Sequence, residues 1–137
     1  MRENRTLYTL NEIAEWARLH PKSIKKWIEE ENIQVVHLGR NKKRIREREI
    51  SNYLNESGFE ISISPLSLRL LTVPETAKWA QLHTKSIYRL ISENKLDVLR
   101  FRPKSFRIPE YEIRDFLLRT GHGYLNEIYD EKLRELT

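Results

Sequence analysis

The sequence contains the stretch LHPKSIKKWI at Leu19–Ile28 and a second version of it, LHTKSIYRLI, at Leu82–Ile91. In both stretches three apolar residues are spaced at i, i+3 and i+4, which is the spacing of one buried helical face. They are Ile24, Trp27 and Ile28 in the first stretch and Ile87, Leu90 and Ile91 in the second. The opposite face carries Lys22, Ser23, Lys25 and Lys26 in the first stretch and Lys85, Ser86, Tyr88 and Arg89 in the second. Such a helix suits DNA recognition, whereas a basic face that only contacts solvent is the plainer interpretation.

These stretches belong to a longer internal repeat. Tyr8–Gly58 aligns with Leu71–Gly121 without a gap at a shift of 63 residues, and 20 of the 51 aligned positions are identical. Because each copy contains all of its own predicted elements, we expect two homologous domains rather than a solenoid. The predicted organisation is a first domain at 1–58, a packed linker at 59–70, a second domain at 71–121 and a helical tail at 122–137.

Each copy begins with the pattern of a capped helix. The segments Thr9–Glu12 and Thr72–Glu75 both read Thr-x-x-Glu, which is the spacing of a capping box. A tryptophan recurs later on this helix, at Trp16 and Trp79. A position in the core is the more common role for such a residue, and base stacking is the less common one.

A break separates this helix from the next one, at Arg18–His20 and Gln81–His83. His20 and His83 stand where the second helix needs an N-cap, and Pro21 suits its first position. Two equivalent histidines can also indicate a metal site, but no further ligand stands at metal-binding spacing. We therefore expect both histidines to cap or turn the chain, and we expect no bound metal or cofactor.

Two β-type runs follow the second helix in each copy, at 34–38 and 43–45 and then at 97–101 and 106–108. The turn residues between the runs predict a hairpin. Cations gather on these hairpins, and the candidate DNA contacts are Arg40, Lys42, Lys43 and Arg44 in the first and Arg102, Lys104 and Arg107 in the second. A third helix closes each copy through Ile50, Tyr53 and Leu54 or through Ile113, Phe116 and Leu117.

Helix, tight turn, helix, basic hairpin and helix make a small winged helix-turn-helix. The predicted fold class is therefore mainly α with small β-hairpin wings, as two tandem winged helix-turn-helix domains. The motifs L-T-x-x-E-x-A, S-I-Y-R-L-I and R-I-P-x-x-E-I of the second copy resemble the excisionase-type and MerR-type DNA-binding domains. The resemblance covers nearly all of both copies. This family often has glycine in the turn, where Arg18 and Gln81 stand here, so we expect a wider or strained turn.

The joining segment and the tail are both amphipathic. Phe59, Ile61 and Ile63 alternate with polar residues, so we expect the linker to be extended, packed and able to fix one domain against the other. The tail, from Tyr124 to Thr137, places Leu125, Ile128, Tyr129, Leu133 and Leu136 on one helical stripe. Packing against the second domain is the plainer role for this stripe, and dimerisation is the alternative.

Composition limits the possible roles. A net charge of +5 favours a polyanionic partner, while the absence of cysteine excludes disulfides and thiolate metal sites. Met1–Arg5 lacks the apolar run of a signal peptide, and no segment is long enough to span a membrane, so we expect a cytoplasmic protein with no membrane partner. Without a glycine-rich phosphate loop or a His, Asp and Ser grouping, an enzyme is not expected.

The leading hypothesis is a sequence-specific protein that binds double-stranded DNA. The resemblance implies an excisionase-like architectural factor or a small transcriptional regulator whose two domains bind adjacent sites. It also implies a recombinase or another DNA-bound protein as a further partner. A protein–protein adaptor on the same scaffold is the alternative function. A monomer and a homodimer through the tail are both compatible with the sequence.

Overall fold

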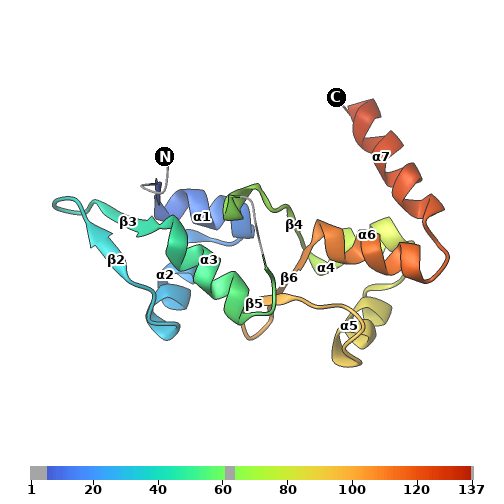
Figure 1. Ribbon diagram of the computed structural model, residues 1–137, viewed down its shortest axis with the longest axis horizontal. Coiled ribbons are helices and arrows are strands. Elements are labelled where there is room, and N and C mark those ends of the chain that lie inside the picture. Colours follow the sequence, from blue (N-terminus) through green and yellow to red (C-terminus); the bar gives the residue numbers. More distant parts are fainter. Residues whose placement is uncertain (1–5, 61–63, 137) are drawn as a thin grey trace.

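The computed structural model describes residues 6–60 and 64–136, in which helices alternate with short antiparallel strands (Figure 1). In chain order the elements are β1 (Leu7–Tyr8), α1 (Leu10–Ala17), α2 (Pro21–Glu30), β2 (Val35–His37), β3 (Lys43–Arg46), α3 (Glu47–Glu56), η1 (Pro65–Ser67), β4 (Leu70–Leu71), α4 (Val73–Ala80), α5 (Thr84–Ser92), β5 (Leu99–Arg102), β6 (Ser105–Pro109), α6 (Glu110–Arg119) and α7 (Tyr124–Leu136). The described part of the chain is thus a mixed α/β protein, mostly helical, with two small sheets. None of its helices is long and apolar enough to cross a bilayer.

The two sheets have the same topology, and their first and third strands pair in the same register. Each has three antiparallel strands, in the orders β1-β3-β2 and β4-β6-β5. Tyr8 pairs with Ile45 and, at the same repeat positions, Leu71 pairs with Ile108. The sequence predicted only two-stranded hairpins. The third strands, β1 and β4, are two residues long each, which is too short for an alternating pattern to reveal.

The predicted helix starts are confirmed by the hydrogen bonds that cap them. Thr9 and Thr72 both form complete capping boxes with the glutamate three residues later. The Nδ1 atom of His20 accepts a bond of 3.1 Å from the backbone N–H of Lys22, so this side chain caps α2. His83 occupies the equivalent N-cap position but makes no side-chain capping bond.

The turn between the first two helices of each repeat is strained, as the missing glycine predicted. Arg18 and Gln81 end α1 and α4 in the left-handed conformation, with φ of 60° and 56°. This conformation costs a residue other than glycine about 1–2 kcal/mol. Each residue donates its backbone N–H to carbonyls of the preceding helical turn, which ends the helix and sends the chain into α2 or α5.

The joining segment packs against the first repeat. Phe59, Leu68 and Leu70 are buried in the same core as the helices of that repeat. The indole Nε1–H of Trp16 donates to the Leu68 carbonyl at 2.8 Å. The segment is not extended throughout, because η1 forms a turn of 3₁₀ helix. The alternating Ile61 and Ile63 lie outside the described residues.

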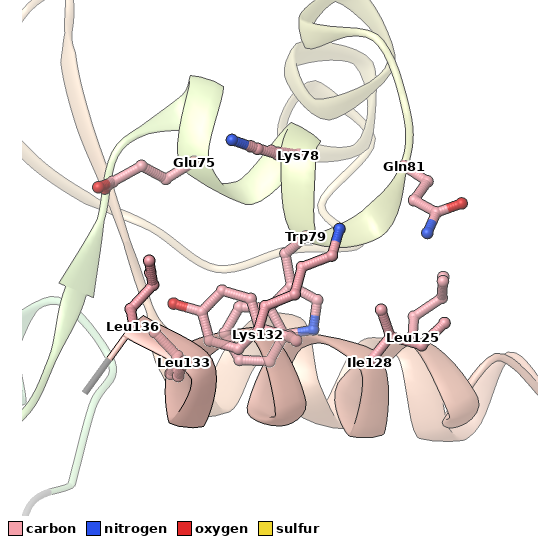
Figure 2. A pocket seen from close by; sticks show the side chains of 10 residues that line it. Glu75, Lys78, Trp79, Gln81, Leu125, Ile128, Lys132, Leu133 and Leu136 are labelled. Atoms are coloured by element: carbon pink, nitrogen blue, oxygen red, sulfur yellow. The ribbon is translucent and has the colours of Figure 1, made fainter.

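The tail helix α7 packs on the second repeat through its first turns. The ring of Tyr129 stacks on that of Trp79 at 3.6 Å between centroids, and the Nε1–H of Trp79 donates to Asn126 Oδ1 at 2.9 Å. Further along, α7 leaves the body of the molecule, and Leu136 is 83% exposed (Figure 1). Figure 2 shows the groove of about 310 Å³ that lies between α4 and the apolar stripe of α7.

Candidate nucleic-acid interface

Helix α2 presents its basic side chains to solvent because its apolar face is anchored in the first core. Ile24 and Trp27 are at most 1% exposed, whereas Lys22, Lys25 and Lys26 are exposed and Ser23 is half-buried. The acidic run Glu29–Glu31 lies at the C-terminal end of the helix. A DNA backbone would be repelled there, so the first turns of α2 are the part that suits nucleic acid.

Helix α5 has the same arrangement in the second repeat. Lys85, Tyr88 and Arg89 are exposed, Ser86 is half-buried, and Arg89 Nη2 donates to Ser86 Oγ at 3.4 Å. The ring of Tyr88 contacts that of Phe106 on β6 edge-on, with centroids 6.0 Å apart. This contact positions the outward face of α5 against the second hairpin.

A further cation lies beside α5 that was not among the candidate DNA contacts. The guanidinium of Arg100 stacks over the ring of Phe106, with Cζ 4.6 Å from the centroid, and the Arg100 side chain is exposed. The signal for it was present in the alternation of Leu99, Arg100 and Phe101, because the two apolar neighbours turn inward and leave the arginine outward.

The first hairpin, β2–β3, extends away from the rest of the molecule (Figure 1). Arg40, Lys42 and Lys43 are exposed on it, and Arg44 is half-buried with its Nη1 donating to the Lys43 carbonyl at 2.9 Å. The predicted cations of this hairpin therefore lie together on one projecting arm. Such an arm can reach a polyanion without disturbing the core.

The second hairpin, β5–β6, has different surroundings, because it packs against the first repeat. Phe101 is 2% exposed, and its ring contacts those of Trp16, Trp27 and Tyr53 at centroid distances of 5.7, 5.3 and 5.6 Å. A register shift between Arg100 and Arg102 marks a bulge at Phe101, and bulges re-aim side chains in this way. The Tyr53 hydroxyl adds a bond of 2.9 Å to the Arg100 carbonyl.

Two of the predicted DNA contacts on this hairpin are bound to the protein instead. Arg107 donates from Nε to the Ala17 carbonyl at 2.7 Å and from Nη2 to the Arg18 carbonyl at 2.8 Å. Arg102 forms an ion pair with Glu30 at the end of α2. Lys104, at the turn, is exposed. Arg102 and Arg107 therefore differ from the other candidate DNA contacts, because their side chains are bonded to residues of the first repeat.

The contacts at the junction of the repeats shift the pKa values of Arg107 and Glu75. Burial, with the nearby charge of Arg18 adding to it, lowers the pKa of the Arg107 guanidinium. Burial raises the pKa of the Glu75 carboxyl, but hydrogen bonds from Thr72 and the ion pair with Arg18 outweigh it, so the net pKa is lowered. The Arg18–Glu75 pair, at 2.6 Å, links the end of α1 to the start of α4.

The two basic helices lie along the same edge of the molecule. In Figure 1 α2 and α5 both lie at the lower edge of the view, with the second hairpin between them. The exposed cations of both helices and of the first hairpin are therefore separated along the long axis rather than gathered at one point.

The chain was compared with protein-family models, curated proteins and solved structures, and none of them matches it.

Proposed function

We propose that the protein binds double-stranded DNA in a sequence-specific manner through two tandem winged helix-turn-helix domains. Helices α2 and α5 would enter the major groove with their first turns, and the first hairpin would track the backbone or the minor groove. The observation that carries the proposal is the repeated helix with a buried apolar face and an exposed basic face, present twice along one edge of the molecule.

The contacts fall into two physical classes. Lys25, Lys26 and Arg89 are long, exposed donors on helices, which suits hydrogen bonding to guanine edges. Arg40, Lys42 and Lys43 lie on an arm and suit phosphate contacts that position the protein without reading sequence. An excisionase-like architectural factor and a small transcriptional regulator both need contacts of these two classes.

The experiment is selection of bound sites from random duplex DNA by the full chain, followed by gel-shift assays of the enriched and shuffled sites. The expected result is an enriched motif that is bound more tightly than its shuffled form. Binding without enrichment would reduce the proposal to non-specific DNA binding. A failure to bind any duplex at low salt would exclude it.

A protein–protein adaptor is the second candidate, and the groove between α4 and α7 is the observation that favours it. Ile128 is 36% exposed there, and Leu136 is more exposed still. The exposed cations of α2 and α5 have no evident role in that case. The same gel-shift assay with random DNA separates the two candidates, because an adaptor has no reason to bind duplex DNA.

A further inference from the structure

We propose that the second hairpin is a clamp between the two repeats, and that it restricts the protein to pairs of DNA half-sites at one fixed separation. This inference rests on the proposed function. It assigns to Phe101 and Arg107 a positioning role in the choice of DNA, although neither residue touches the DNA itself.

The first observation is that two equivalent hairpins have opposite surroundings. Leu38 of the first hairpin and Phe101 of the second occupy the same repeat position, yet they are 54% and 2% exposed. The Phe101 ring lies among Trp16, Trp27 and Tyr53, and Trp27 belongs to α2. The second hairpin is therefore anchored directly on one of the two DNA-binding helices.

The second observation concerns the equivalent arginines. Arg44 and Arg107 both donate from Nη1 to the carbonyl of the preceding residue, so the two side chains leave their strands in the same way. Only Arg107 also donates to the carbonyls of Ala17 and Arg18. These carbonyls lie at the tight turn that leads into α2, so Arg107 holds the turn that sets the direction of that helix.

The third observation is that the same hairpin also contacts α5. Phe106 meets Tyr88 of α5, while Phe101 meets Trp27 of α2. The hairpin thus contacts both helices, α2 through Phe101 on β5 and α5 through Phe106 on β6. The separation and the relative rotation of α2 and α5 therefore depend on this hairpin, in addition to the packed joining segment.

A fixed pair of helices has a direct consequence on DNA. Inserting one base pair between two half-sites moves the second by about 3.4 Å and rotates it by about a tenth of a turn. A protein whose domains are clamped cannot follow this change without releasing one half-site or distorting the duplex. A protein whose domains are joined by a flexible tether can follow it.

The test measures the affinity of the full-length chain for the selected site and for versions with one, two, five and ten base pairs inserted between the half-sites. We expect one or two base pairs to weaken binding at least about tenfold, the equivalent of one base contact. Five should weaken it on the order of 100-fold, the lower end of the gain from two linked sites. Ten should not restore it, although the helical phase is regained.

Comparable affinity for the parent site and for the two- and ten-base-pair insertions would overturn the inference while leaving the proposed function intact. A failure to bind any selected duplex would instead overturn the proposed function, and the inference with it. The wild-type series needs no variant, so it stays decisive even if changes at the clamp disturb folding.

A matched pair of variants tests the residues themselves. Phe101→Ala with Arg107→Gln should make binding to the parent and inserted sites nearly equal. Leu38→Ala, at the repeat position of Phe101, should keep the full dependence on spacing. Thermal unfolding followed by circular dichroism establishes that each variant is folded, and Arg107→Gln alone serves if the double variant is not. A folded clamp variant that still rejects the insertions would overturn the assignment.

Discussion

Arg18 and Gln81 show how the backbone of a single residue orients a whole helix. In the left-handed conformation each residue reverses the chain at the end of α1 or α4. Glycine would adopt it without steric cost. In the first repeat two contacts stabilise the strained residue. The side chain of Arg18 pairs with Glu75, and the Arg18 carbonyl accepts a hydrogen bond from Arg107. Gln81 is exposed and forms no such pair among the described contacts.

Gln81→Gly is therefore expected to raise the free energy of unfolding by about 1 kcal/mol, because the left-handed strain is removed and part of the gain is offset by the flexible unfolded chain. Urea unfolding followed by circular dichroism measures the change. Arg18→Gly is the matched control, and it should gain less because it also removes the ion pair with Glu75. Equal gains at the two positions would show that this ion pair contributes nothing.

Phe101 carries a second prediction at this scale. Phe101→Ala should lower the free energy of unfolding by about 3–5 kcal/mol, since it leaves a cavity among three aromatic rings. Leu38→Ala, at the equivalent exposed position, should change it by no more than about 0.5 kcal/mol. Chemical denaturation of both variants compares them directly. A small effect of Phe101→Ala would mean that the repeats are not held together by this ring.

Base reading is the third prediction for single side chains. Lys25→Ala with Lys26→Ala, or Arg89→Ala, should weaken binding and relax the preference at particular base pairs by roughly 1–3 kcal/mol for each hydrogen-bonded base that is no longer read. Competition gel shifts with single-base-pair variants of the selected site measure this. If affinity falls equally for every sequence, these side chains contact only phosphate.

At the scale of elements, the sequence predicted what depends on local pattern. The capping boxes and the hairpins follow from neighbouring residues, and the structure has each of them. The predicted i, i+3, i+4 faces are fully buried in α2 and α3, whereas Leu90 of α5 and Phe116 of α6 are only half-buried. The different surroundings of the second hairpin do not follow from neighbouring residues. Both hairpins have the same apolar alternation, since Val36 and Leu38 in the first correspond to Leu99 and Phe101 in the second.

The candidate DNA contacts also divide into those whose surroundings the local pattern predicted and those whose surroundings it did not. The cations of α2, α5 and the first hairpin are exposed as the helical and strand patterns indicated. Arg102 and Arg107 are not free, because their partners are an acid and two carbonyls that lie more than seventy residues earlier in the chain. Periodicity and charge cannot reveal a contact between the two repeats, although Arg102 does stand at the repeat position of Gly39 in the turn of the first hairpin.

The two hairpins should therefore respond differently to removal of charge. We expect duplex binding to fall with salt at a log–log slope steeper than about −2, because phosphate contacts release counterions. Replacing Arg40, Lys42 and Lys43 with Ala should reduce the slope by about 0.9 for each phosphate that is no longer neutralised. Arg102→Ala should change it less, since Arg102 is paired with Glu30. Equal changes in slope would mean that both hairpins contact DNA.

At the scale of the whole molecule, the contact between the repeats is heterologous. The second hairpin packs on the first repeat, but the first hairpin does not pack on the second, because Leu38 is exposed. If a pseudo-two-fold axis related the two repeats, each hairpin would make the same contact with the other repeat. The repeats of one chain are therefore not arranged as a symmetric dimer would be.

This asymmetry determines the form of the DNA site that we expect. Domains that are not related by a two-fold axis suit a direct repeat, whereas a palindrome needs a symmetric pair of readers. If α2 and α5 read one face of the duplex, their half-sites should lie about one helical turn apart, or roughly 10 base pairs. Lys25 and Lys26 correspond to Tyr88 and Arg89, so the half-sites should be similar but not identical.

The last prediction is an imperfect direct repeat occupied by a single chain. Footprinting on the selected site gives the symmetry of the protected bases, and analytical ultracentrifugation of the complex gives the number of chains bound. One chain on a direct repeat is the expected outcome, because a single molecule already carries both of the helices proposed to read DNA. A palindromic footprint occupied by two chains would contradict it. The symmetric contact would then have to lie elsewhere, and the exposed residues Ile128 and Leu136 of α7 would be the surface to test by substitution.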